Sequence, residues 1–263
     1  MATADVECKN CAARFAAATG FCSRCGQALA VERLTFRKLL ADAAHQLTDT
    51  DAGFWFTLRQ LTRRPGAAVQ EYLRGKRKAY TKPLQFYLVL LAVFFGLTEL
   101  LHLDVVAIRY RIMSQSGLSW FSRIFATLLD PSGEDTSRQV LALFQQNIKV
   151  NYSLLVIMLG CTLWAGFRHR GFTLVEMVVL ALYLVGYKYL FETAAMLVMI
   201  TPLGPESRLS VGSALLMLSN GYLWWAIAGF PDKITLWSVV RALLLLLATG
   251  MLLHSFCLLI ISL

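Results

Sequence analysis

Charged residues are scarce in this sequence. They make up 16% of its 263 residues, whereas about 25% is usual in a soluble globular domain. Hydrophobic residues make up 57% of the chain. This balance excludes an ordinary soluble domain and indicates an integral membrane protein.

Catalytic signatures are also absent. The sequence has no P-loop, no GxSxG or HExxH motif and no paired intramembrane aspartates, which are patterns that mark enzyme sites. The N-terminus MATADVECKN lacks a basic region followed by an apolar core and a small-residue cleavage site, so no cleavable signal peptide is predicted. We therefore expect a non-enzymatic protein whose first membrane helix acts as an uncleaved signal.

The polar residues are segregated along the chain. Residues 1–82 carry most of the basic charge, and residues 84–263 hold several long apolar runs. We therefore predict an all-α polytopic membrane protein in three parts. These are a small N-terminal domain at 1–30, amphipathic juxtamembrane helices with a basic flank at 31–82, and a membrane domain at 83–263.

A basic cluster precedes the first apolar run. Its members, which face the single acid Glu71, are Arg63, Arg64, Arg74, Lys76, Arg77, Lys78 and Lys82. Short basic flanks of a membrane helix stay in the cytoplasm, so the N-terminus is predicted to be cytosolic. An anionic leaflet attracts each Lys or Arg by about 1 kcal/mol. The net charge of +9 is therefore interpreted as contact with anionic headgroups rather than with nucleic acid.

Four cysteines form two CxxC knuckles near the N-terminus, with the spacing C-x2-C-x10-C-x2-C: Cys8, Cys11, Cys22 and Cys25. Two such knuckles place four thiolates around one tetrahedral zinc ion. The alternatives are two disulfides or a redox pair. The cytosol disfavours stable disulfides, and the βαβ pattern that accompanies a redox CxxC is absent. Residues 1–30 are therefore predicted to be a zinc ribbon, and one structural zinc ion is the predicted cofactor.

The residues around the knuckles fit this interpretation. Gly26 follows the second knuckle, where a positive φ relieves a tight turn. Phe15 and Phe21 are expected to cover the metal. Because so small a segment cannot bury a core of its own, the metal would supply its folding energy. Cys161 and Cys257 lie in apolar runs and are interpreted as packing residues.

Three short helices are predicted between the ribbon and the first span. The first covers 31–48, the second follows a cap at Thr50 or Asp51 and ends at Pro65-Gly66, and the third covers 67–78 with its cations in the last turn. The first two are amphipathic and rich in aromatic and basic residues. Such helices lie in the membrane interface; the alternative is a small helical subdomain packed on the ribbon.

This part of the chain resembles a known bacterial family. The stretches FCSRCGQ, GFWFTLRQLTRRPG and EYLRGKRKAYTKPLQFYLV are similar to the family called domain of unknown function 3667. The residues that match its signature are Arg64, Pro65, Gly66, Tyr72, Gly75, Lys76, Arg77, Tyr80 and Pro83. Ala12 departs from the ribbon pattern, which often has Gly there. The resemblance implies a ribbon followed by a bacterial membrane bundle, and it implies no activity.

Five membrane spans are predicted from runs of roughly 20 apolar residues. They lie at about 84–103, 149–167, 172–199, 209–230 and 234–261. The long connection 104–148 is expected on the outer side, with a helix on the membrane surface near Trp120. The basic turn Arg168-His169-Arg170 then falls on the cytosolic side, as the positive-inside rule requires. The C-terminus is predicted to be periplasmic.

Ionisable residues within the spans are costly and are default functional candidates. Those near the cytosolic face are Glu176 and Arg241. Those toward the outer face are Glu99, His102, Lys188, Glu192 and His254. Lys188 and Glu192 are four residues apart and can pair on one helix face. The set is interpreted either as a polar pathway or lipid headgroup site, or as structural pairing with snorkelling at span ends.

The function predicted first is that of a bacterial inner-membrane adaptor whose cytosolic zinc ribbon binds a cytosolic or membrane protein. The alternative is a transporter or lipid-translocating protein that uses the buried charges. A membrane enzyme acting on lipid precursors is the third hypothesis, and no catalytic motif supports it.

Overall fold

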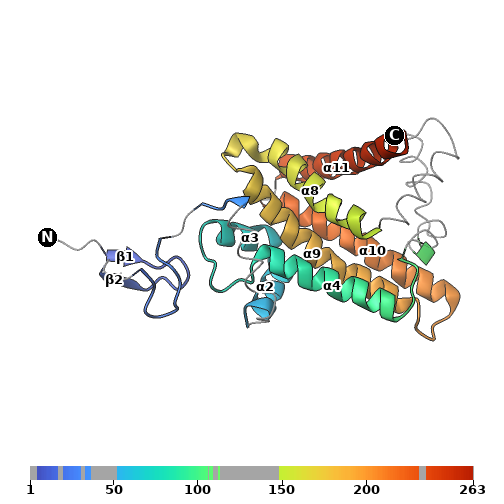
Figure 1. Ribbon diagram of the computed structural model, residues 1–263, viewed down its shortest axis with the longest axis horizontal. Coiled ribbons are helices and arrows are strands. Elements are labelled where there is room, and N and C mark those ends of the chain that lie inside the picture. Colours follow the sequence, from blue (N-terminus) through green and yellow to red (C-terminus); the bar gives the residue numbers. More distant parts are fainter. Residues whose placement is uncertain are drawn as a thin grey trace.

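The computed structural model describes residues 5–16, 20–30, 33–36, 52–105, 107–108, 112, 148–230 and 235–262. Strands β1 (Asp5–Glu7) and β2 (Arg14–Ala16) form an antiparallel hairpin at the N-terminus. The helices are α2 (Ala52–Arg63), α3 (Pro65–Leu73), α4 (Pro83–Leu100), α8 (Ile148–Phe167), the 3-10 helix η1 (Arg168–Arg170), α9 (Leu174–Val198), α10 (Pro205–Ala228) and α11 (Leu236–Ser262). In Figure 1 the hairpin lies at one end of the molecule, which we call the ribbon end, and α4, α9 and α10 run along its long axis.

The predicted helical membrane architecture is confirmed in outline. Among the described residues, α4, α9 and α10 are long and apolar enough to cross a membrane, and the stretch Leu236–Leu252 of α11 is a shorter apolar helix. Helices α4, α8, α9, α10 and α11 coincide with the five predicted spans to within a few residues. The hairpin adds two short strands to a chain whose other described elements are helices.

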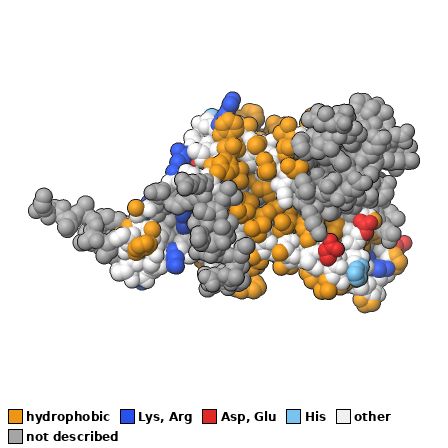
Figure 2. Space-filling model, in the orientation of Figure 1, with side chains coloured by type: hydrophobic (Ala, Val, Ile, Leu, Met, Phe, Trp, Pro, Cys, Tyr) orange, Lys and Arg blue, Asp and Glu red, His pale blue; other side chains and the backbone are white. Residues whose placement is uncertain are grey.

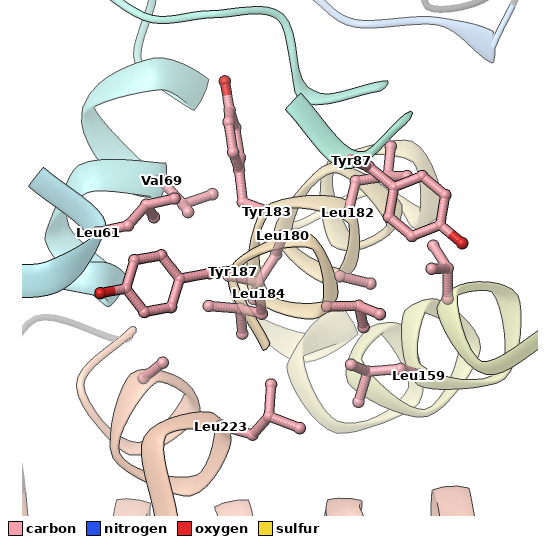
Figure 3. Packing of buried hydrophobic residues seen from close by; sticks show 14 of the residues in the cluster. Leu61, Val69, Tyr87, Leu159, Leu180, Leu182, Tyr183, Leu184, Tyr187 and Leu223 are labelled. Atoms are coloured by element: carbon pink, nitrogen blue, oxygen red, sulfur yellow. The ribbon is translucent and has the colours of Figure 1, made fainter. Parts of the chain in front are cut away.

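Helix α9 lies at the centre of the bundle. Its residues are apolar on all sides, which is typical of a helix surrounded by protein, and every residue from Val179 to Tyr189 is buried. Figure 3 shows Tyr87 of α4, Leu159 of α8 and Leu223 of α10 around it, with Leu61 of α2 on a further side. Helices α2, α3, α4, α8 and α10 therefore pack around α9, and α11 packs on α8 and α10.

Glycines set the closest helix contacts. A Cβ on Gly186 of α9 would lie 3.2 Å from the Cα of Tyr87 in α4, and a Cβ on Gly160 of α8 would lie 2.8 Å from the side chain of Val178 in α9. Helix α11 packs on α8, where the hydroxyls of Thr162 and Thr249 are 2.7 Å apart. Small residues let helix backbones approach closely. These positions therefore set the distances of α4 and α8 from α9 and of α11 from α8.

Helices α2 and α3 pack on the bundle itself. The Tyr222 hydroxyl donates to the Leu61 carbonyl at 3.2 Å, and the hydroxyls of Thr62 and Tyr187 are 2.9 Å apart. A Cβ on Gly66 would lie 2.6 Å from the backbone of Gly229. For the helix after Asp51, which is α2, the sequence predicted the bilayer interface or the ribbon as the partner of the apolar face. Helices α9 and α10 instead contact α2 at Thr62 and Leu61.

The predicted end of the third helix was wrong. Helix α3 ends at Leu73, and Gly75 has a φ of +112°. A glycine in this region of backbone space terminates a helix, so Lys76, Arg77 and Lys78 lie in the following loop rather than in the last helical turn. The end at Pro65 was predicted correctly, because proline cannot continue α2 but fits the first turn of α3.

Some predictions fall outside the described residues. These are most of the first juxtamembrane helix at 31–48, the outer-surface helix near Trp120, and the turn 231–234.

On the face shown in Figure 2, Lys and Arg side chains gather mainly at the ribbon end, hydrophobic surface covers the middle, and Asp and Glu side chains lie toward the opposite end.

Candidate metal centre

The two CxxC knuckles have the same backbone geometry. In the first, the amide of Cys8 donates to Ala13 and the amide of Ala12 donates to Cys8; in the second, Cys22 pairs with Gln27 and Gly26 with Cys22 in the same way. Ala12 and Gly26 occupy equivalent places, with φ of 57° and 70°. The positive φ predicted for Gly26 is therefore confirmed, and Ala12 adopts it despite its Cβ.

The four cysteine sulfurs fit a single metal ion. The Sγ atoms of Cys8 and Cys25 are 3.6 Å apart, as are those of Cys11 and Cys22, and all four lie within 4.8 Å of one another. A tetrahedral ion with metal–sulfur bonds of about 2.3 Å requires sulfurs roughly 3.8 Å apart. None of the four forms a disulfide. They can therefore act together as one ligand set.

The protein covers this centre only in part. Cys8 and Cys22 are buried, whereas Cys11 and Cys25 are partly exposed. The prediction that Phe21 covers the metal is wrong, because 66% of Phe21 is exposed. The Phe15 side chain lies outside the described part of the structure. The ribbon therefore has an apolar side chain on its surface instead of beneath its metal site.

One side chain joins the ribbon to the loop between α3 and α4. The Gln27 amide nitrogen donates to the Gly75 carbonyl at 2.7 Å, and its oxygen accepts the amides of Arg77 and Lys78 at 3.1 Å each. Gln27 is buried at this contact. Asn10, from the first knuckle, accepts the amide of Ala79 at 3.3 Å. Both knuckles therefore bind residues 75–79, which we call the signature loop.

A second contact joins the ribbon's C-terminal segment to the start of α9. The Arg33 guanidinium donates to both carboxylate oxygens of Glu176, at 3.0 and 3.1 Å, and to the Gly171 carbonyl at 2.8 Å. Glu176 also completes a capping box with Thr173 at the N-terminus of α9. The hydrogen bond and charge of Glu176 raise the pKa of Arg33, as is expected for a charge-assisted bidentate pair.

Glu71 is the centre of the signature segment. Its carboxylate accepts from Lys76 and from the Tyr80 hydroxyl at 3.0 Å each, and pairs with Arg64 at 2.9 Å. Burial raises the pKa of this carboxyl, but the hydrogen bonds from Lys76 and Tyr80 and the charges of Lys76 and Arg64 outweigh burial and hold it below its ordinary value. Burial and the charge of Glu71 in turn raise the pKa of Tyr80.

The predicted basic cluster is divided by these contacts. Arg64 and Lys76 bind Glu71, and the Arg77 guanidinium lies 5.8 Å from the Tyr72 ring centroid. The exposed members are Arg63, Arg64, Arg74 and Lys78; Lys76, Arg77 and Lys82 are half-buried. Part of the cluster is therefore structural, and part remains at the surface of the ribbon end.

The predicted intramembrane polar set does not converge on one site in the described residues. Lys188 and Glu192 form the predicted pair and are buried within α9. Glu176 binds Arg33, whereas the Arg241 guanidinium lies 5.6 Å from the Phe167 ring centroid. Glu99, near the far end of α4, and His102, just beyond it, are exposed. The His254 side chain lies outside the described part of the structure.

Sequence reasoning missed Gln27, Asn10 and Arg33 as contact residues. Gln27 stands directly after the second knuckle in FCSRCGQ, and Asn10 stands inside CKNC. Their position in the knuckles was the available signal. Their partners lie 48 to 69 residues further along the chain, and no local pattern identifies such partners.

Comparison with known proteins supports the family resemblance. The family model described as "Protein of unknown function (DUF3667)" matches residues 51–95. No curated protein and no solved structure was found to match the chain. The matched residues contain α2, α3, the Glu71 contacts, the signature loop and the first part of α4. Residues 51–95 are therefore similar to this family of unknown function.

Proposed function

We propose that the protein is a bacterial inner-membrane adaptor, without enzymatic activity, whose zinc ribbon presents a protein-binding surface at the cytosolic face. The carrying observation is the contact of Gln27 with the signature loop, because it fixes the ribbon on the bundle. A ribbon held at one place and orientation can position a partner beside the membrane.

Zinc is the metal that suits the ribbon best. Closed sites with four cysteine ligands favour zinc and are usually structural. Zinc would join the two knuckles and thereby hold Asn10 and Gln27 in the positions from which they bind the signature loop. The metal in this proposal shapes a surface and takes no part in a reaction.

The proposed orientation places the ribbon end in the cytosol and gives the chain five spans. Helices α8 and α11 add to the three helices of membrane length, and the basic side chains of the ribbon end meet the positive-inside rule (Figure 2). Surface members of the basic cluster, such as Arg63 and Lys78, would contact anionic headgroups. An odd number of spans places the C-terminus in the periplasm.

The face of the ribbon that would bind a partner includes Phe21. This side chain is exposed, as are Ser23 and Arg24 beside it. An exposed aromatic ring with a neighbouring arginine is typical of protein-binding surfaces. The contact residues Gln27 and Asn10 bind the chain's own signature loop, so this face remains available.

The test is to purify the full chain in native-lipid discs, as wild type and as Cys22→Ser, Gln27→Ala and Phe21→Ser. An adaptor is expected to retain a protein at near-stoichiometric amounts in the wild type and to lose it in Cys22→Ser and Phe21→Ser. Gln27→Ala should keep the metal but weaken retention. A partner retained equally by all four proteins would overturn the adaptor proposal.

Transport remains the second candidate because of one observation. Lys188 and Glu192 form an ion pair that is buried in the central helix, and such groups mark pathways in membrane proteins. A transporter would lose substrate movement in Glu192→Gln and keep it in Phe21→Ser. The adaptor would show the reverse pattern in partner binding.

A further inference from the structure

Arg241 lies at the ribbon end of the α8–α11 pair. It follows Leu236, the first residue of α11, by five residues, which is a rise of about 7.5 Å along the helix. Its guanidinium lies 5.6 Å from the ring centroid of Phe167, the last residue of α8. One turn further along α11, Leu245 approaches Gly166 of α8. The Arg241 side chain is therefore level with the end of α8, where the chain leaves the apolar bundle.

The charge of Arg241 has no acidic partner in the described structure. Its Nη1 is buried and makes no hydrogen bond there, whereas the residue as a whole is partly exposed. Glu176, a described acid at this end, is bound by Arg33. A ring face offers electrostatic attraction but no hydrogen-bond acceptor of the kind that a guanidinium requires. Because Nη1 itself is buried, an oxyanion would approach the partly exposed remainder of the guanidinium and supply an acceptor there.

Further positive charge follows Phe167 directly. Helix η1 consists of Arg168, His169 and Arg170, and all three are exposed. Arginine favours phosphate, because its planar guanidinium can donate two parallel hydrogen bonds. The ligand class indicated by these side chains is therefore a phosphate group at the ribbon end of α8 and α11.

An exposed apolar surface on α11 continues from this site. Trp237, Val240 and Leu244 are exposed at 70%, 37% and 56%, and their spacing of three and four residues places them on one side of the helix. Arg241 is four residues from Trp237 and three from Leu244, so it borders this surface. A ligand with a phosphate headgroup and acyl chains matches both features.

We propose that an anionic phospholipid binds at this place, with its phosphate on Arg241 and Arg168 and its acyl chains along Trp237, Val240 and Leu244. The site requires the membrane setting of the proposed function but not the adaptor role. Loss of lipid in an Arg241 variant and loss of a protein partner in Cys22→Ser are therefore separate results.

The experiment uses the full chain in detergent, supplied with equal amounts of phosphatidylglycerol and phosphatidylcholine, and counts retained lipids by native mass spectrometry. Wild type should retain phosphatidylglycerol preferentially. Arg241→Gln should lower this retention about tenfold, the effect of removing one charged hydrogen-bonded contact. Arg168→Gln, which changes an exposed side chain and leaves folding intact, should lower it in the same direction. Arg24→Gln on the ribbon is the matched control and should retain lipid like the wild type.

Addition of inorganic phosphate distinguishes the two sources of the anion. Continued retention of phosphatidylglycerol supports a lipid site with acyl-chain contacts. A protein that shows no preference between the lipids but binds inorganic phosphate through Arg241 has a free-phosphate site, and the lipid proposal is then wrong. If wild type, Arg168→Gln and Arg241→Gln all retain the same amount of phosphatidylglycerol, the proposed site is wrong.

Discussion

The Gln27 side chain donates to the Gly75 carbonyl at 2.7 Å and so connects the metal ribbon to a loop that lies 48 residues later in the sequence. Gln27 stands two residues after Cys25, and Gly75 is the left-handed residue that ends α3. The conformation of the second knuckle therefore determines whether Gln27 can reach the loop. This relationship links the four-cysteine cluster to the segment that matches the family model.

Replacing Gln27 with Ala should release the signature loop without loss of metal. The substitution removes all three of its hydrogen bonds to residues 75–78, and buried partners left unpaired cost about 1–3 kcal/mol. The amides of Arg77 and Lys78 donate to the side-chain oxygen of Gln27. Hydrogen exchange at these two amides should therefore accelerate when Gln27 is replaced. Ser23→Ala, at an exposed position of the same ribbon, is the control. Unchanged exchange at residues 77 and 78 in Gln27→Ala would contradict the contact.

The sequence predicted the local features of this arrangement but not the contacts between them. Cysteine spacing identified the four sulfurs that cluster within metal-binding distance, because a knuckle is a local structure. Apolar runs identified the helices for the same reason. The pattern of α2 showed an apolar face, yet nothing in it distinguishes a bilayer from α9 and α10 as the covering surface. Arg33 and Glu176 are separated by 143 residues, and only the folded bundle brings them together.

Substitutions at the two knuckle turns should have opposite effects. Ala12 has a φ of 57° and Gly26 a φ of 70°, a region that costs a residue with a Cβ about 1 kcal/mol. Ala12→Gly should therefore strengthen metal retention, and Gly26→Ala should weaken it. Competition with a zinc chelator at fixed pH measures both. Equal metal affinity in the two variants would show that these turns carry no strain.

Replacing Gly66 with Ala should destabilise the junction between α3 and α10. The new Cβ would lie 2.6 Å from the backbone of Gly229, and backbone atoms cannot rotate away as a side chain can. Such overpacking costs about 1–3 kcal/mol. Gly96→Ala in α4 is the matched control, because its Cβ would meet nothing within 4 Å. Thermal unfolding in detergent should show a clear decrease for Gly66→Ala and little change for Gly96→Ala.

Stability should depend on the ionisation of Glu71 at acidic pH. Its pKa is lowered in the folded protein, so its contribution is present above the pKa of the unfolded chain and is lost as pH falls through the lower, folded pKa. Glu71→Gln should therefore lower the free energy of unfolding at neutral pH. It should also reduce the loss of this free energy as the pH falls into the acidic range. Glu206→Gln, at an exposed position in α10, should preserve the wild-type profile. An identical acid slope in wild type and Glu71→Gln would mean that the contacts of Glu71 contribute nothing.

Removing the metal should have the same effect on the signature loop as removing Gln27. Without an ion the four cysteines no longer hold the two knuckles together, and a segment of this size cannot fold on its own core. Asn10 and Gln27 would then lose their positions opposite Ala79 and Gly75. Chelation of the wild type should therefore accelerate exchange at the amides of residues 77–79 while the central residues of α9 stay protected. In Gln27→Ala, chelation should add little further exchange at residues 77 and 78, because the contact is already absent. A large additional effect there would show that the metal acts on the loop through another route.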